Sequence, residues 1–133
     1  MIETLINALA KENVALNDTQ TSQFKKYYQL LIEWNEKMNL TAITEPTEVA
    51  IKHFYDSITF LFHTDIKECG KVIDVGTGAG FPGIPLKIMR PDIQLTLLDS
   101  LNKRLIFLQE VCDNIGIDAE IIPVSYTHLT LPT

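Results

Sequence analysis

The sequence predicts an α/β fold, in which a helical segment precedes a doubly wound parallel β-sheet. Two observations lead to this prediction. Up to residue 70 the apolar residues recur at helical spacing, whereas from Lys71 onward short apolar strands alternate with helices in the order βαβαβ. In addition, residues 72–83 combine an apolar strand, an acidic strand end and a glycine-rich turn, the arrangement of nucleotide-type cofactor sites. We therefore expect a helical cap over residues 1–70 and a sheet over residues 71–122.

Two helices are expected at the start of the cap. The first covers about residues 2–11, and the second starts at Asn17 or Asp18, each of which can cap it. The apolar residues of the second helix recur at helical spacing and are Phe24, Tyr28, Leu31, Trp34 and Met38. This pattern predicts one long amphipathic helix.

A third helix is expected after a short connector. The hydroxyl of Thr44 can cap a first turn that contains Pro46, and we expect this helix to break near His53 and to end before Gly70. The sheet region then reads as a strand to Val75, a helix over about 83–89, a strand over 93–98, a helix over about 101–115 and a strand over about 119–122. Such an alternation predicts parallel strands with right-handed crossovers.

Composition restricts the functional classes. The chain has 133 residues, the length of one domain. It contains no apolar run near the roughly 18 residues of a membrane helix, and its N-terminus does not have the basic-then-apolar pattern of a signal peptide. We therefore expect a cytoplasmic protein. Cys69 and Cys112 are far apart and form no C-x-x-C pair, which favours reduced thiols and no metal site. The net charge of −6 argues against binding nucleic acid by bulk electrostatics. The densest basic pairs are Lys25-Lys26 and Lys103-Arg104, which on composition alone indicate solvated helix faces.

The glycine-rich turn has the spacing of a cofactor site. Gly76, Gly78 and Gly80 follow the first strand, and Asp99 ends the next strand about 20 residues downstream, where a ribose-binding carboxylate is expected. A carboxylate at that position can accept hydrogen bonds from two ribose hydroxyls. The alternative is a tight turn that binds no ligand.

Two departures from the dinucleotide fingerprint favour a different cofactor. The third glycine of that fingerprint would fall at position 81, which is Phe81, and the strand ends in Asp74 two residues before the first glycine. A carboxylate there suits the positively charged amino acid end of S-adenosylmethionine better than a pyrophosphate. The pattern therefore favours a methyltransferase, while a nicotinamide dinucleotide-binding oxidoreductase domain and a non-catalytic RNA-binding fragment remain the alternatives.

Several ordered motifs resemble the RsmG family, also called GidB. They are Trp34-Asn35, residues 38–41, residues 53–57, residues 74–86 and residues 98–104. The resemblance extends to about Ile122 and implies a Rossmann-like, S-adenosylmethionine-dependent methyltransferase that modifies N7 of a guanine in bacterial 16S ribosomal RNA. It also implies that 16S ribosomal RNA or the small ribosomal subunit is the partner, and a monomer at full length.

The resemblance also assigns roles to residues. Gly76 and Phe81 match positions that contact S-adenosylmethionine; Asp74, Gly78 and Gly80 complete the loop, and Asp99 matches the ribose-binding acid. The N-terminal signature residues are Asn39, His53, Asp56 and Ser57, which either contact RNA or brace the helical cap. Lys103 and Arg104 become candidate phosphate contacts. Guanine N7 has a lone pair and carries no proton, so we expect no catalytic acid or base, and His53 is not assigned as one.

The last residues of the chain depart from the family pattern. Residues 123–133 have no charge and no helical period, and we expect them to be foreign to a family chain truncated after about residue 122. In the complete sheet a fourth strand would lie beside the first. Without it, the first strand is expected to be an exposed edge. We accordingly expect a marginally stable chain with little or no activity.

Overall fold

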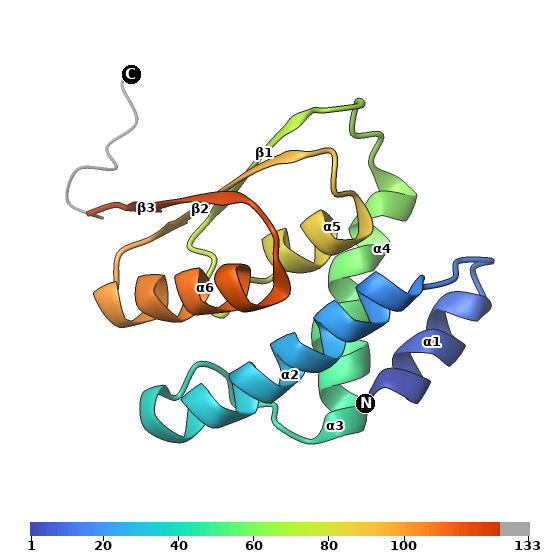
Figure 1. The fold of residues 1–133 in the computed structure, drawn as a ribbon, viewed down its shortest axis with the longest axis horizontal. Coiled ribbons are helices and arrows are strands. Elements are labelled where there is room, and N and C mark those ends of the chain that lie inside the picture. The colour runs from blue at the N-terminus through green and yellow to red at the C-terminus, as the bar shows by residue number, and fades with distance from the viewer. Residues whose placement is uncertain (126–133) are drawn as a thin grey trace.

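Three parallel strands form the sheet in the order β1 (Lys71–Val75), β2 (Gln94–Asp99) and β3 (Ala119–Pro123) (Figure 1). This computed structural model describes residues 1–125. The crossover helices α5 (Gly83–Met89) and α6 (Asn102–Ile115) lie on the same side of the sheet. The element order confirms the predicted α/β fold and its βαβαβ alternation. The two helices end where the sequence indicated, α5 at Arg90 and α6 at Gly116, which adopts a left-handed conformation (φ 72°).

The opposite face of the described sheet is uncovered. Ile73 and Val75 of β1 are 62% and 60% exposed, and Val75 stands in register with Leu98, which in turn stands in register with Ile122. Side chains alternate along a strand, so Leu97, the neighbour of Leu98, points to the helices and is buried. Within residues 1–125, β1 is an edge strand with an apolar exposed face, as predicted.

The long helix α2 (Asp18–Met38) begins with a capping box. Asn17 Oδ1 accepts a hydrogen bond from the Gln20 amide at 2.7 Å, and Gln20 Oε1 accepts one from the Asn17 amide at 3.0 Å. The predicted apolar face is present but incomplete, because Tyr28 is partly buried against the core as expected, whereas Tyr27, which was not predicted, is fully buried. The reason is that α2 packs against α1 (Ile2–Ala10) as well as α5 and α6, so its buried face is wider than one stripe.

Two predictions about the third helical segment are wrong. Glu45, not Thr44, caps the helix, since its carboxylate accepts hydrogen bonds from the Thr47 and Glu48 amides at 3.1 and 2.9 Å, which lowers the Glu45 pKa. The segment also does not break near His53. It continues from α3 (Pro46–Glu48) through a π-helical segment, η1 (Val49–Tyr55), into α4 (Asp56–His63). The wider turn keeps the backbone paired, with the Asp56 amide donating to the Ile51 carbonyl.

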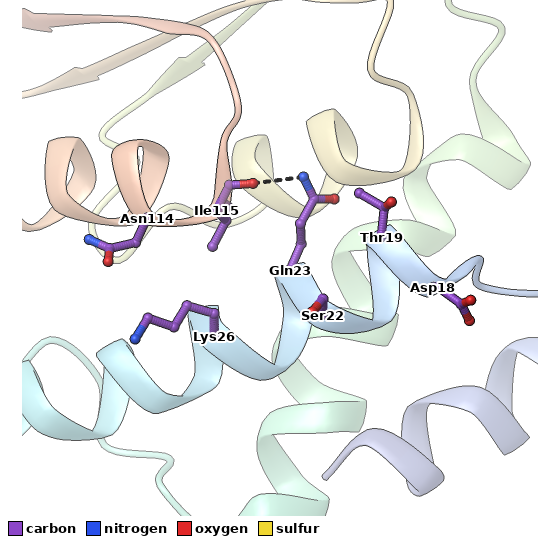
Figure 2. A pocket seen from close by; sticks show the side chains of 7 residues that line it. All are labelled: Asp18, Thr19, Ser22, Gln23, Lys26, Asn114 and Ile115. Atoms are coloured by element: carbon purple, nitrogen blue, oxygen red, sulfur yellow. Dashed lines mark hydrogen bonds between the residues drawn. The ribbon is translucent and has the colours of Figure 1, made fainter.

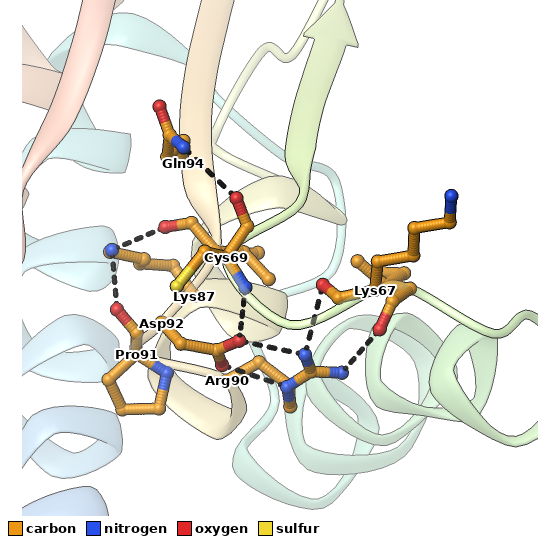
Figure 3. Close-up of polar contacts among 9 residues, drawn as sticks. Lys67, Cys69, Lys87, Arg90, Pro91, Asp92 and Gln94 are labelled. Atoms are coloured by element: carbon orange, nitrogen blue, oxygen red, sulfur yellow. Dashed lines mark hydrogen bonds and ion pairs between the residues drawn. The ribbon is translucent and has the colours of Figure 1, made fainter.

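A polar cluster fixes the turn that precedes β2 (Figure 3). Lys87, only 9% exposed, donates from Nζ to the Pro91 and Ile93 carbonyls at 2.7 and 2.6 Å. Arg90 pairs with Asp92 at 2.8 Å, and this ion pair holds the pKa of Asp92 well below its usual range. These contacts lie at the amino ends of the strands, away from the glycine turn.

One buried core joins the two segments of the chain. Phe24 of α2 and Phe54 of η1 belong to the same apolar cluster as Leu97 of β2 and Phe107 of α6. None of the helices in residues 1–125 has both the length and the apolar character that crossing a membrane requires. The prediction of a foreign tail concerns residues 123–133, of which 126–133 lie outside the described residues.

Candidate functional site

The glycine turn lies at the carboxyl ends of β1 and β2. Gly76, Gly78 and Gly80 have φ values of 68°, 59° and 100°, a region that side chains rarely adopt. The amides of Gly76 and Thr77 both donate to the Leu98 carbonyl, at 2.9 and 3.1 Å. The turn is therefore attached to the end of the neighbouring strand, where open α/β sheets bind their ligands.

Asp74 fastens both ends of this turn. Its Oδ2 accepts a hydrogen bond from Thr77 Oγ1 at 2.7 Å and another from the Gly83 amide at 2.9 Å. Burial raises the pKa of Asp74, these two hydrogen bonds oppose that shift, and the charge of Asp99 adds to it. Both bonds fall on Oδ2, so within residues 1–125 the other oxygen, Oδ1, accepts no hydrogen bond.

Asp99 meets the turn from β2. Its side chain is fully buried, with Oδ2 accepting from the Gly78 amide at 2.9 Å and Oδ1 accepting from the Leu101 amide at 3.0 Å. Arg104 Nη1 lies 3.6 Å from Oδ1. The structure thus brings Asp99 against the glycine turn, because the carboxyl ends of parallel neighbours lie at one edge of the sheet.

A cavity of 320 Å³ opens beside the turn. Residues of η1 and α4 line one wall and the end of the glycine turn lines the other; they are Lys52, His53, Asp56, Ser57, Phe60, Phe81 and Pro82. Three predicted residues of the N-terminal signature, His53, Asp56 and Ser57, therefore share one cavity with the predicted cofactor contact Phe81.

His53 links the connector after α2 to the glycine turn. Its ring stacks on Phe81, with centroids 4.4 Å apart and planes 9° apart, and its Nε2 lies 2.7 Å from Thr41 Oγ1. Thr41 is in turn held through its amide, which donates to Asn35 Oδ1 at 2.8 Å. Burial lowers the pKa of His53, and the nearby Asp56 carboxylate opposes that shift.

The remaining predicted substrate residues are dispersed. Asn39 is the C-terminal cap of α2, with φ 50° and its amide bonded to the Asn35 carbonyl at 3.1 Å, and it is not among the residues that line the cavity. Lys103 is exposed in the first turn of α6. Arg104 is engaged with Asp99, so of this basic pair Lys103 is the more accessible.

The sequence reasoning missed Tyr27. Its hydroxyl donates to the Ala79 carbonyl at 2.6 Å, and its ring stacks on Phe81 with centroids 5.6 Å apart. The sequence contained a hint of this role, because Tyr27 stands three residues after Phe24 and residues three apart share a helix face. Tyr28, four residues after Phe24, has an equally helical spacing and was predicted in its place.

A larger cavity of 570 Å³ lies between α2 and α6 (Figure 2). Gln23 and Lys26 from α2 face Asn114 and Ile115 from the end of α6, and Gln23 Nε2 donates to the Ile115 carbonyl at 2.9 Å. The end of α6 leads into the start of β3, so this cavity lies at the amino ends of the strands. It is therefore at the edge of the sheet opposite the glycine turn.

Both cysteines are free thiols, as predicted. Cys69 is exposed, whereas burial raises the pKa of the Cys112 thiol to about 12. Across the part of the chain that the structure describes, no three His, Cys, Asp or Glu side chains gather as a metal site would need.

Comparison with known proteins decides the family. The family model described as rRNA small subunit methyltransferase G matches residues 20–125, which include the glycine turn, Asp99 and the lining of the adjacent cavity. The chain belongs to this family. The predicted RsmG resemblance is therefore confirmed.

The similar relatives carry the same name, ribosomal RNA small subunit methyltransferase G. One from Desulforamulus reducens is 57% identical over 114 residues, which cover 86% of this chain and 48% of the relative. One from Exiguobacterium sp. is 54% identical over 113 residues (85% and 48%), and one from Bacillus velezensis is 50% identical over 117 residues (88% and 49%). The chain spans about half the length of the curated relatives it matches.

Proposed function

We propose that this chain carries the S-adenosylmethionine-binding segment of a methyltransferase that modifies N7 of a guanine in the 16S ribosomal RNA of the small subunit. The observation that carries the proposal is the glycine turn held between two carboxylates, Asp74 and Asp99, in a member of the rRNA small subunit methyltransferase G family. The names of the relatives support a ribosomal RNA substrate. Such a substrate places the activity in the cytoplasm.

The residues present suit this cofactor. A Cβ added to Gly78 would have no heavy atom within 4 Å, so the turn presents its backbone to open space where a ligand can approach. Oδ1 of Asp74 is available to the positively charged amino group of the cofactor, and Asp99 stands where ribose hydroxyls would need an acceptor. Gly76, Gly80 and Phe81 would complete the binding surface.

The chemistry requires positioning more than proton transfer. When bound, S-adenosylmethionine supplies a sulfonium methyl group, and guanine N7 can attack it in line without losing a proton. The lowered pKa of His53 favours a neutral ring at pH 7, and its Nε2 is already engaged with Thr41. We therefore assign no catalytic acid or base to the chain.

Substrate contact is proposed for His53 and Asp56, which line the cavity, and for Lys103 and Arg104 at the start of α6. It is also proposed for Asn39, the C-terminal cap of α2, which is not part of the cavity lining. In this proposal residues 1–70 act as a helical cap beside the cofactor, and residues 71–122 supply the strands and the glycine turn. We expect little or no methyl transfer from this chain alone, since it spans about half the length of its relatives.

Calorimetry with S-adenosylhomocysteine tests the proposal. We expect binding by this chain and tighter binding by the Bacillus velezensis relative. Asp99→Asn should weaken binding at least tenfold, because hydrogen bonds to a charged acceptor are the stronger kind, whereas Asp118→Asn, at an exposed position, should leave it unchanged.

Two results would contradict the proposal. Thermal protection by a nicotinamide dinucleotide, with none from S-adenosylhomocysteine, would favour the oxidoreductase alternative. RNA affinity without any cofactor binding in either protein would favour a non-catalytic RNA-binding role.

A further inference from the structure

Tyr27 makes a long-range contact with the centre of the glycine turn. It lies on α2 with no exposed surface, and its hydroxyl donates to the Ala79 carbonyl at 2.6 Å, although the two residues are 52 positions apart in the sequence. Ala79 lies between Gly78 and Gly80, two residues with positive φ. The bond therefore holds the backbone between two glycines of the turn from outside the sheet.

The Tyr27 ring holds the end of the same turn. It stacks on Phe81, with centroids 5.6 Å apart and planes 28° apart, and it also packs against Phe54 at 5.2 Å. Phe54 contacts Phe81 as well, at 5.9 Å. Phe81 thus packs between the rings of Tyr27 from α2 and Phe54 from η1. The Tyr27 hydroxyl binds the backbone two residues earlier, at Ala79.

The site has room for the hydroxyl only because position 80 is glycine. A Cβ at Gly80 would lie 2.6 Å from the Tyr27 oxygen. Burial raises the pKa of Tyr27 well above its usual value, and the nearby Cys112 and Asp74 add to the shift. The hydroxyl therefore keeps its proton and acts as the donor to Ala79.

We propose that Tyr27 is a positioning residue, which holds the glycine turn in the conformation that receives the cofactor and so sets cofactor affinity from the helical segment. This inference rests on the proposed function of the turn. Tyr27 acts on the cofactor through the Ala79 carbonyl and the Phe81 ring. A phenylalanine at position 27 would keep the ring contacts and lose only the hydroxyl, so this substitution separates the positioning role from general packing.

Tyr27→Phe tests the inference, and Tyr28→Phe is its matched control. The Tyr28 hydroxyl also donates from α2 to a backbone carbonyl, that of Thr44 at 3.2 Å, which lies outside the glycine turn. In the free chain, amide hydrogen exchange over residues 76–84 should be about fivefold faster in Tyr27→Phe, the factor expected for losing one net hydrogen bond, and unchanged in Tyr28→Phe. Exchange in β2 should stay the same in both variants.

The second measurement is calorimetric affinity for S-adenosylhomocysteine. We expect Tyr27→Phe to weaken binding about fivefold or more, while Tyr28→Phe binds as the unmodified chain does. Equal turn exchange in the two variants, or an equal rise of exchange in β2 and the turn, would overturn the inference. If the unmodified chain binds no S-adenosylhomocysteine, the exchange data alone decide whether Tyr27 orders the turn, and the proposed function fails if the Bacillus velezensis relative binds none either.

Discussion

Gly80→Ala is the substitution that the structure predicts to be most damaging in the glycine turn. Three glycines provide the comparison, because Gly78, Gly80 and Gly116 all have positive φ, and an L-residue in the left-handed region costs about 1–2 kcal/mol. At Gly78 and Gly116 an added Cβ meets nothing within 4 Å, so that cost is the whole effect. At Gly80 the Cβ would come within 2.6 Å of the Tyr27 hydroxyl and of Ile84 Cδ1.

Both contacts at Gly80 are with fully buried side chains. The Cβ would also come within 3.1 Å of Ile84 Cγ1, and the Tyr27 hydroxyl can move only by leaving the Ala79 carbonyl. A buried carbonyl left without a donor costs about 1–3 kcal/mol. We therefore expect Gly80→Ala to lower the free energy of unfolding by about 2–5 kcal/mol, against about 1–2 kcal/mol for Gly116→Ala.

Urea unfolding followed by circular dichroism measures these differences, and a double variant isolates the Tyr27 contribution. In Gly80→Ala/Tyr27→Phe the clashing hydroxyl is gone, so the combined loss should be smaller than the sum of the two single losses by about 1 kcal/mol or more. Strict additivity would refute the reasoning. So would a Gly80→Ala variant as stable as Gly116→Ala.

Three further predictions follow from other parts of the structure. Replacing Ile73 and Val75, 62% and 60% exposed on the uncovered sheet face, by Thr should reduce self-association in analytical ultracentrifugation without loss of the circular dichroism signal; unchanged association would argue against this face as the cause. Because burial lowers the His53 pKa, the unfolded state takes up the proton first, and stability should fall as the pH drops below about 6.5. His53→Gln should flatten the fall of the urea midpoint between about pH 7 and 5, and a slope equal to that of the unmodified chain would contradict the assignment. Lys87→Met should cost about 1–3 kcal/mol in urea unfolding, because two carbonyls of the turn before β2 lose their donor; a neutral effect would show that water replaces it.

The strands and the glycine turn were predictable because local signals define them. Pro91 and Gly116 terminate the helices of the sheet region, and the predicted helix 83–89 coincides with α5. The meeting of Asp99 with the turn also follows from topology, since parallel neighbours present their carboxyl ends at one edge. These features depend on short-range sequence and a general rule of sheet geometry.

The errors fall where tertiary packing decides. Thr44 and Glu45 are both able to cap a helix, and only the observed path of the connector selects Glu45. A helix turns by about 100° per residue, so periodicity locates a buried face but does not separate Tyr27 from Tyr28 at its border. The π-helical segment around His53 likewise depends on tertiary packing, since it buries Val49, Ala50 and Phe54 in the core.

The free structure holds the glycine turn from two sides at neighbouring residues. Asp99 accepts from the Gly78 amide at 2.9 Å, and Tyr27 donates to the Ala79 carbonyl at 2.6 Å. Each carboxylate oxygen of Asp99 accepts one of these backbone hydrogen bonds and has a second lone pair, so in the proposed function ribose hydroxyls can bind Asp99 without displacing the Gly78 amide. The Tyr27 bond ends on the next residue of the turn and does not involve Asp99. In the proposed function the strand and the helical segment would therefore hold neighbouring residues of the turn while the ligand binds, with Asp99 free to meet the ligand as well as the turn.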